Sequence, residues 1–559
     1  MTRGADLILT GGKIVTVDPQ FRLAEALAVT DGRISAVGKA AEVLENADQW
    51  TKVVDLEGRT VVPGLIDGHA HLDREGLKGV FPSLGPTRSI ADVQVALAHL
   101  VECTPVGEWI VTMPLGDPPA YRNVEALFSD GRLPNRHDLD AVAPDHPVYI
   151  RAIWGYWRHS TPLISIANTK ALQAAGIDAS TASPAPEVTI ERDEEGFPTG
   201  VFREETLMPI VELAFFREAT GFAPETRAKT LPTSVAAYHR YGTTSVFEGH
   251  GAASELIQAY RSAHASGELK IRTTLAISPN WKSVPDTNIP LFVEAWCGWL
   301  SGAGIGDDFL RIAGLFADID PSPSNAVRAS AYPRTGWAGF NYDTALSRER
   351  AIELLTACAR QRIQVIAIWP NMLELFYEVH KSVPLTGLRW VFSHISLLNA
   401  AQVEMIREMG LIVTTHTNRY IYKEGQLLLE RVGKSRENEI TPLRTLVEAG
   451  VPVVLATDNV PVSLFHPFWH VVARRTRTDG TLVAKTQALS REQALRAITS
   501  TAALLTWDED KKGTIEVGKL ADLAVLDHDP LTCPEDQLPD IQSVLTVVGG
   551  EIVYASMRV

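Results

Sequence analysis

The chain has 559 residues, of which 45% are hydrophobic and 21% are charged, so it is long enough for more than one domain and for a large buried core. Its net charge of -15 argues against nucleic acid and against an anionic membrane surface as partners. No apolar run is long enough for a membrane span or for a usual signal peptide, and the four cysteines form no CxxC pair. We therefore expect a cytoplasmic protein.

Both ends of the chain are predicted to form short strands. Near the N-terminus an Asp-Gly turn separates two apolar runs, which is a hairpin signal, and Ser543–Val548 has the same character near the C-terminus. Neither end offers much core alone. We expect residues 1–60 and 510–559 to form one small β-sandwich domain, with the C-terminal strand paired to strands near Ile8 and Ile14.

Between the two ends, apolar strands alternate with helical patterns. The strands are predicted at Val61–Asp67, Thr243–Phe247, Ile271–Ile277, Leu310–Phe316, Ile363–Ile368, Trp390–Phe392, Leu411–Thr415 and Val453–Ala456. Such alternation indicates an α/β protein with a covered parallel sheet, and this number of strands matches a (β/α)8 TIM barrel. We assign the barrel to residues 61–73 and 231–509. Residues 74–230, which contain a further apolar strand at Val148–Ile153, are predicted to be a large insertion after strand one that covers the barrel mouth.

The first barrel strand ends in His69-Ala70-His71. In extended chain, residues i and i+2 point to the same face, so both imidazoles leave the strand end side by side. Two convergent imidazoles can share one divalent metal ion, whereas the alternative is two surface histidines. The motif follows Pro63-Gly64 and Asp67-Gly68 at the end of an apolar strand, and ligand-type residues recur at later strand ends. We therefore favour the metal site.

Other ionisable residues end later strands, where the active sites of TIM barrels lie. His394 ends strand six and Asp458 ends strand eight. A metal hydrolase needs ligands and a carboxylate that can take a proton from water. We predict four metal ligands, namely His69, His71, His394 and Asp458, with Asp458 also as the catalytic base. The alternatives are a core histidine at His394 and a turn cap at Asp458.

Substrate contacts are predicted at residues near other strand ends and in the insertion. These are His250, His416, Trp154, Trp157 and Trp369. His250 is otherwise a solvated loop residue, the tryptophans otherwise pack in a core, and Glu248 and Asp318 are assigned structural roles. The same loops offer no arginine-rich anion clamp. We therefore expect a small substrate that is mostly apolar or aromatic and carries little charge.

The segment Pro63–His71 resembles the first-strand signature of the amidohydrolase superfamily, whose members are metal-dependent hydrolases on a (β/α)8 barrel. Asn168–Leu172 and Pro198–Glu204 resemble its YtcJ-like branch, which includes N-substituted formamide deformylases. His394 and Asp458 match the superfamily's sixth-strand histidine and eighth-strand aspartate. The resemblance runs over nearly the whole chain and implies a metal-dependent amidohydrolase.

The chain departs from that resemblance at two ligand positions. A fourth-strand lysine of the branch is replaced by Gly314, and a fifth-strand histidine by a residue near Ala367. A bridged pair of ions needs a bridging ligand and enough donors for both ions. We therefore expect one divalent ion, most readily Zn²⁺, with Mn²⁺ or Fe²⁺ as alternatives. The competing interpretation is that the metal has been lost.

The leading functional hypothesis is hydrolysis of a C–N bond in a small amide, formamide or cyclic amide. A second hypothesis keeps the barrel enzyme but changes the reaction to deamination of a heterocycle, or to a lyase or isomerase step. A third is a degenerate barrel that only binds a small molecule, which the four retained ligand candidates disfavour. The barrel loops set the substrate, and the sequence leaves both its identity and a homo-oligomeric state open.

Overall fold

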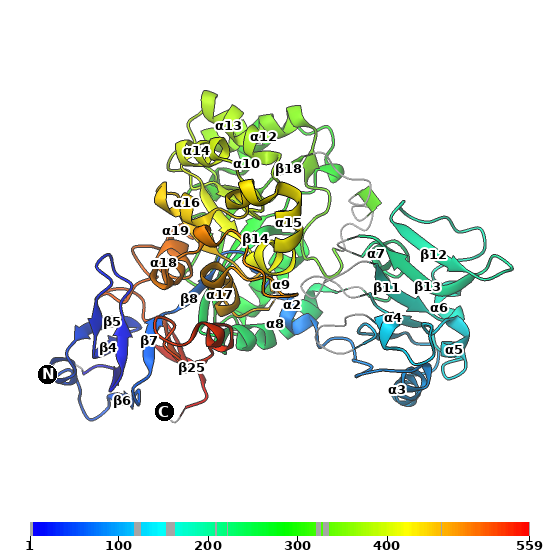
Figure 1. Ribbon diagram of the computed structural model, residues 1–559, viewed down its shortest axis with the longest axis horizontal. Helices are drawn as coiled ribbons and strands as arrows, with labels where there is room; N and C mark the ends of the chain where they lie inside the picture. The colour runs from blue at the N-terminus through cyan, green and yellow to red at the C-terminus, as the bar shows by residue number, and fades with distance from the viewer. Residues whose placement is uncertain are drawn as a thin grey trace. The chain divides into compact units, whose positions relative to one another are not determined.

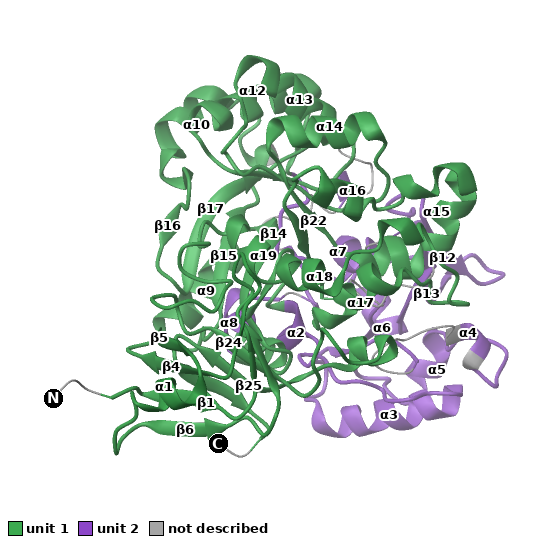
Figure 2. Ribbon diagram, turned by 60° about the vertical axis from the view of Figure 1, so that its left-hand side comes forward, with its two compact units in different colours: residues 1–73, 231–320, 344–559 green, residues 74–230, 321–343 purple. Residues whose placement is uncertain are grey.

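The computed structural model describes residues 4–116, 124–152, 162–206, 209–220, 222–319, 326–327, 335–459 and 461–557. The chain divides into two compact units, which Figure 2 shows in different colours. Unit 1 comprises Met1–Asp73, Leu231–Asp320 and Thr344–Val559, and unit 2 comprises Arg74–Thr230 and Pro321–Asp343. Across the described ranges, no helix is both long and apolar enough to cross a bilayer.

Unit 1 contains eight parallel strands in the order expected of a TIM barrel. They are β8 (Leu65–Asp67), β14 (Thr243–Ala252), β15 (Arg272–Ile277), β17 (Leu310–Phe316), β20 (Val365–Ala367), β21 (Val391–Phe392), β22 (Ile412–Thr415) and β23 (Val453–Leu455). Figure 1 labels two of them, β8 and β14. A short strand, β16 (Ile305–Gly306), pairs antiparallel with β17. The first and last strands meet where Gly68 N–H donates to Leu455 O at 3.2 Å, so the sheet is nearly closed. The predicted (β/α)8 barrel is confirmed.

Helices of unit 1 cover the outside of these strands. They include α9 (Ser254–Ala265), α10 (Ile289–Trp296), α12 (Arg348–Arg360), α13 (Met372–Ser382), α14 (Ala400–Met409), α15 (Gly425–Val432), α16 (Leu443–Glu448), α17 (Phe465–Ala473), α18 (Arg491–Ala497) and α19 (Ser500–Leu505). Helix α14 has a clear capping signal at each end. Asn399 and Gln402 form a capping box at its start, and Gly410 ends it with a left-handed backbone at φ 65°.

The core has one apolar layer inside the strands and another between strands and helices. Ile66, Phe247 and Phe316 belong to the inner layer, and all three are almost completely buried. The outer layer includes Trp390, whose ring packs 4.7 Å from that of Phe376 on α13. Because strands of this barrel bury both faces, their sequences are continuously apolar.

The predicted first strand is divided in two. Thr60–Pro63 forms β7 in a separate sheet, and only β8 enters the barrel. The break falls at Gly64, where an added Cβ would lie 2.2 Å from Thr244 Oγ1. A side chain at this position would therefore push the first two barrel strands apart.

The two chain ends build two sheets with a shared apolar core. One sheet has the order β5-β4-β1-β6 and the other β26-β25-β24-β7-β2-β3. The strands are β1 (Leu7–Thr10), β2 (Lys13–Val15), β3 (Leu23–Ala24), β4 (Ala26–Thr30), β5 (Arg33–Gly38), β6 (Lys52–Asp55), β24 (Leu523–Leu526), β25 (Ser543–Val548) and β26 (Glu551–Ala555). A short helix, α1 (Ala40–Leu44), contacts the first sheet. Leu9 and Leu27 from one end share a core cluster with Val525 and Leu545 from the other.

The direct pairing predicted for the C-terminal strand is wrong. β25 lies between β24 and β26, and β24 pairs antiparallel with β7, which in turn pairs with β2. The two ends therefore join through β7, a strand that the sequence analysis had placed in the barrel. The domain boundaries near residues 60 and 510 stay a prediction, because these sheets and the barrel belong to the same compact unit.

Unit 2 is built on a five-stranded sheet with the order β12-β13-β11-β10-β9. Its strands are β9 (Ile110–Thr112), β10 (Val148–Ile150), β11 (Leu163–Ala167), β12 (Val188–Arg192) and β13 (Pro198–Glu204). Its helices are α2 (Arg74–Leu77), α3 (Ile90–Cys103), α4 (Val124–Leu127), α5 (Arg136–Asp140), α6 (Thr169–Ala174) and α7 (Val211–Phe215). That this unit covers the barrel mouth stays a prediction.

Unit 2 also contains residues 321–343, which the sequence analysis assigned to the barrel. A buried ion pair lies beside this segment: Arg151 donates to the Glu212 carboxylate at 2.8 and 3.0 Å. The Arg151 guanidinium also lies 5.5 Å from the Trp337 ring, and Arg74 donates to Ala338 O at 2.9 Å. These contacts hold the segment to unit 2.

A buried histidine in unit 1 gives the first testable prediction. His239 ends α8 (Pro224–His239), and burial lowers its pKa to about 4, against a small opposing effect of a backbone hydrogen bond with Lys270. The folded state holds His239 as the neutral imidazole. The contribution of His239 to the free energy of unfolding is therefore complete above pH 6.5 and is lost as the pH falls towards 4. We expect wild type to lose about 2 kcal/mol more than His239→Gln between pH 7 and pH 5.

Urea unfolding midpoints of both proteins at the two pH values measure this difference. The glutamine side chain does not titrate and keeps a hydrogen-bonding group, so it is a close control for size and polarity. Equal losses of stability in the two proteins would show that His239 is protonated as readily in the folded state as in the unfolded state.

Candidate metal centre

Several polar side chains of the described residues stand at the C-terminal ends of barrel strands, where TIM-barrel enzymes place their active sites. Two histidines follow β8, a glutamate and a histidine lie on β14, and single residues follow β21, β22 and β23: His69, His71, Glu248, His250, His394, His416 and Asp458. Six of them form two sets whose potential ligand atoms all lie within 4.8 Å of one another in each set. The four predicted ligands therefore lie close together at this end of the barrel, and His250 and His416 lie beside them.

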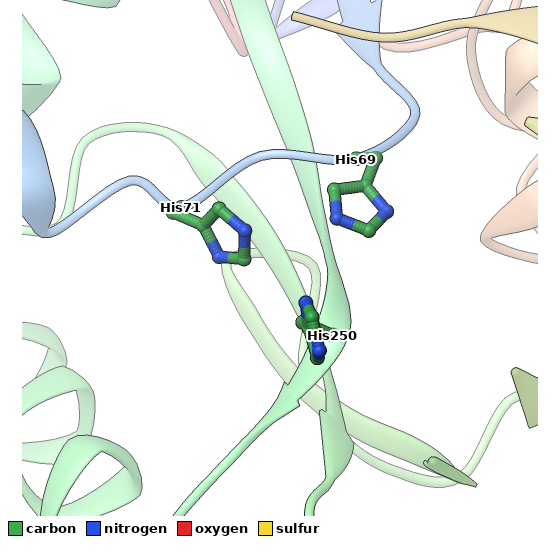
Figure 3. Close-up of side chains that lie close together, drawn as sticks. All are labelled: His69, His71 and His250. Atoms are coloured by element: carbon green, nitrogen blue, oxygen red, sulfur yellow. The ribbon is translucent and has the colours of Figure 1, made fainter. Parts of the chain in front are cut away.

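The first donor group consists of His69, His71 and His250. The ring centroids of His69 and His71 are 5.3 Å apart. The centroid of His250 lies 6.1 Å from that of His69 and 6.0 Å from that of His71. Figure 3 shows the three rings facing a common space below the chain that follows β8. Gly249 permits this approach, because a Cβ there would lie 2.4 Å from His69 Nδ1.

The second donor group consists of His394, His416 and Asp458. The two imidazole centroids are 4.5 Å apart, and Asp458 Oδ2 lies 3.6 Å from His416 Nδ1. Both ring nitrogens of His394 are buried and have no hydrogen-bond partner among the described residues. A neutral imidazole in this setting has a lone pair available for a cation.

The two donor groups adjoin each other. His71 Nε2 lies 3.1 Å from Asp458 Oδ1, and the rings of His69 and His394 are 4.9 Å apart. The sequence predicted one set of four ligands, whereas the structure divides these four between two groups. Histidines that the sequence had assigned to substrate binding complete both groups.

Glu248 makes a contact with His71 that the sequence analysis missed. Its carboxylate is buried and hydrogen-bonded to His71 Nδ1. When Nδ1–H donates to this carboxylate, Nε2 is the nitrogen that would bind a cation, and carboxylate–histidine pairs of this kind orient metal ligands in many proteins. The available signal was spacing: Glu248 and His250 are two residues apart on one strand and so share a face.

Hydrogen bonds fix the first and last strand ends to each other. Asp458 N–H donates to His69 O at 3.0 Å, and the Asn459 side chain both accepts from His71 N–H and donates to His71 O, each at 2.8 Å. Tyr238 donates its hydroxyl to the same Asn459 oxygen at 3.2 Å. Asn459 is thus a positioning residue for the His-Ala-His segment.

The backbone holds three of these residues in left-handed conformations. The φ angles are 57° for His394, 51° for Asp458 and 62° for Asn459. Such angles are uncommon for residues with a Cβ, and they gather at sites where the surrounding structure fixes a side-chain direction. The turn after each strand therefore aims its side chain at the cluster.

The protonation states suit cation binding. Burial lowers the pKa of the His394 imidazole well below its usual value, and the neighbouring His416 lowers it further. Burial alone would raise the pKa of the Asp458 carboxyl, but His416 and His71 lower it more, and the net pKa is well below its usual value. At neutral pH the site offers a neutral imidazole at His394 and an ionised carboxylate at Asp458, the forms in which these groups bind metals.

The two departures from the superfamily pattern have structural counterparts. Gly314 has a φ of 82°, and a Cβ there would lie 2.8 Å from Gln364 O of the neighbouring chain segment, so a lysine does not fit this backbone. At the end of strand five, Trp369 donates its indole N–H to Asp318 Oδ2 at 3.0 Å. Neither strand four nor strand five supplies a ligand at the position that the resemblance suggested. The additional donors that could hold a cation come instead from strand two, with His250, and from strand seven, with His416.

The structure describes only some of the other residues that were predicted to contact the substrate. Trp369 is 38% exposed beside the end of strand five, while Trp154 and Trp157 lie outside the described residues. Tyr420, which the sequence analysis missed, has its ring 5.3 Å from that of His416 and 6.4 Å from that of His394. It belongs to a π-helical turn at Asn418–Lys423, and turns of this type are frequent at functional sites.

Comparison with known proteins agrees with this architecture. The amidohydrolase family model matches residues 52–554. An N-substituted formamide deformylase of Arthrobacter pascens is 26% identical and covers 99% of both chains, and the putative amidohydrolase YtcJ of Bacillus subtilis (strain 168) is 24% identical over 97% of this chain and 98% of its own. An uncharacterized metal-dependent hydrolase from Pyrococcus horikoshii OT3 superposes with a TM-score of 0.68 at 20% identity, covering 95% of this chain and 99% of its own. This chain belongs to the amidohydrolase family.

Proposed function

We propose that the chain is a metal-dependent hydrolase that cleaves a C–N bond in a small amide, formamide or cyclic amide. The observation that carries this proposal is the convergence of five histidines and one aspartate at the C-terminal ends of the barrel strands. Family membership supports hydrolysis, and the formamide deformylase among its relatives supports the kind of bond.

The residues that would hold the catalytic ion are His69, His71 and Asp458, with His394 as the fourth ligand predicted from the sequence. Imidazole nitrogens and a single carboxylate suit Zn²⁺ best, with Mn²⁺ or Fe²⁺ as alternatives. When bound, such an ion polarises a substrate carbonyl and acidifies a water molecule.

The chain's own residues would handle the proton. Asp458 is ionised at neutral pH and accepts a proton from the attacking water. The same carboxyl then returns the proton to the leaving nitrogen, so that one group serves as base and then as acid. Glu248 keeps the His71 imidazole in one tautomer throughout, because it accepts the hydrogen bond of Nδ1.

Metal removal and a substrate panel test this proposal. We expect a chelator to abolish turnover and Zn²⁺ to restore it, with activity on uncharged aryl and alkyl formamides, amides and cyclic amides. The partly exposed Trp369 offers an apolar surface for such substrates. The measurement is release of amine or carboxylate from each compound in the panel.

Two outcomes would argue against the proposed reaction. Turnover confined to small charged compounds, such as N-acyl amino acids, would contradict the apolar substrate. Ammonia release from amino-substituted heterocycles, without cleavage of any amide, would favour the deaminase alternative on the same barrel.

A further inference from the structure

We propose that unit 1 carries a docking face for a second copy of this chain, on the outer side of α10 (Ile289–Trp296) and the 3-10 turn η2 (Gly298–Leu300) that follows it. The docking face consists of Leu291, Phe292, Trp296 and Trp299, whose exposed fractions are 61%, 42%, 71% and 47%. Figure 2 shows α10 at the outer edge of unit 1. A docking face here does not depend on which reaction the barrel catalyses.

Helix α10 is apolar on both of its sides. Its inner side carries Ile289 and Val293, which are completely buried, and the helix packs against α12. On the outer side, Phe292 and Trp296 are four residues apart and so lie one above the other, with Leu291 next to Phe292. A helix that is apolar all round is normally covered all round in a folded protein. The outer side of α10 is therefore a surface that calls for a covering partner.

The charges along this segment disfavour a lipid surface as that partner. From Ser283 to Leu310 the chain has no Lys, Arg or His, and its charged residues are Asp286, Glu294, Asp307 and Asp308. Arg350 of α12 reaches the segment, but its guanidinium donates to Pro285 O and Thr287 O at 2.7 and 2.9 Å. Helices that lie on anionic membranes carry Lys or Arg beside their apolar side, and the net charge of -15 opposes such binding further.

The size of the docking face fits the apolar part of a dimer interface. A fully covered aromatic side chain buries about 150–250 Å², so the three aromatic residues leave roughly 300 Å² of aromatic surface uncovered. Leu291 adds to this area, and Val284 and Ile305, both exposed, flank the segment in sequence. A standard interface buries about 800 Å² of each partner, of which about 65% is apolar in homodimers. These residues together supply most of that apolar area.

A second copy of the same chain is the partner that these properties favour. Closed dimers with twofold symmetry place a patch against its own copy, so the patch must be complementary to itself. The docking face meets this condition, because it has no charge that would meet a like charge. Glu294 is two positions from Trp296 and therefore lies on a different side of the helix. Tryptophan and phenylalanine are also enriched at interface centres, and tryptophan is a frequent hot spot.

The test is the mass of the full chain in solution, measured by sedimentation velocity over a range of concentrations. We expect wild type to form a dimer of two 61.0 kDa chains. Trp296→Lys and Leu291→Lys should each raise the dissociation constant by about 30-fold or more, since each removes apolar contact and adds a charge to both copies. Trp296→Phe keeps an aromatic ring and should keep the dimer.

Trp50→Lys is the matched control, because Trp50 is 82% exposed and lies outside the docking face. This variant should form the dimer with wild-type affinity. The replaced side chains are exposed, so the melting temperature of each variant should stay close to that of wild type. If Trp296→Lys nevertheless unfolds, Leu291→Lys serves in its place.

A wild-type chain that stays monomeric at every concentration would overturn the proposal. A dimer with unchanged affinity in both lysine variants would overturn it too, since its interface would lie elsewhere. A monomer that co-sediments with phosphatidylglycerol vesicles, and no longer does so as Trp296→Lys, would show that the face binds lipid instead. None of these measurements involves turnover: hydrolysis by a monomer would refute only the docking face, and a dimer without hydrolysis would refute only the reaction.

Discussion

Replacement of Asp458 by asparagine is expected to lower turnover by about 10²–10⁴-fold while the barrel stays folded. The substitution keeps the size of the side chain and removes its ability to accept and return a proton. It also suits the backbone, because asparagine tolerates the left-handed conformation that Asp458 adopts at φ 51°. The peptide N–H that donates to His69 O is unchanged.

The comparison is the turnover number on the best substrate of the amide panel, measured together with bound metal and melting temperature. Asp479→Asn is the matched control, since it makes the same chemical change in an exposed loop where Asp479 accepts from Thr481 N–H. The control should keep wild-type rates. If Asp458→Asn also kept them with its metal in place, Asp458 would be neither the base nor an essential ligand.

The convergence of these side chains could be predicted from the sequence for a simple geometric reason. Parallel barrel strands end at the same face, so residues that end different strands meet without any knowledge of loop structure. His69 and His71 were identifiable from their i, i+2 spacing, and His394 and Asp458 from their positions after apolar strands. All four lie in the cluster.

What the sequence did not predict depends on how the strands pack against one another. The division into two donor groups requires the distances across the barrel that set His250 beside His71 and His416 beside Asp458. The tautomer fixed by Glu248 likewise requires a contact between residues 177 positions apart. The spacing of residues within one strand predicts neither the distances across the barrel nor the contact between Glu248 and His71.

Local backbone geometry explains the remaining differences. The first barrel strand looked continuous from Val61, yet it divides at Gly64, a position where Thr244 leaves no room for a side chain. Similarly, the register shift between β15 and β17 around Gly314 changes which side chains face the neighbouring strand. A break or bulge of this kind adds or removes one residue, and each such step reverses the faces of all residues that follow it.

The C-terminal strands are expected to stabilise the whole of unit 1, and a deletion from Ser543 onward tests this. The deletion removes β25, in which Leu545, Thr546 and Val547 are completely buried. Without β25, β24 becomes an open edge of its sheet. The deletion also removes the hydrogen bond from Thr546 Oγ1 to His239 O, which uncovers the end of α8.

The expected loss is large compared with the stability of a folded protein. Burial of Leu545 and Val547 contributes about 1.5–3 kcal/mol for each side chain, and the lost strand pairing adds to this, against a net stability of about 5–15 kcal/mol. We expect a lower melting temperature for the barrel signal, or an insoluble chain, and not merely a disordered tail. Deletion from Ser556 onward keeps β25 and β26 and should cost far less. A protein truncated at Ser543 with unchanged melting temperature and solubility would show that the two chain ends do not form one cooperative β structure, whatever their strand order.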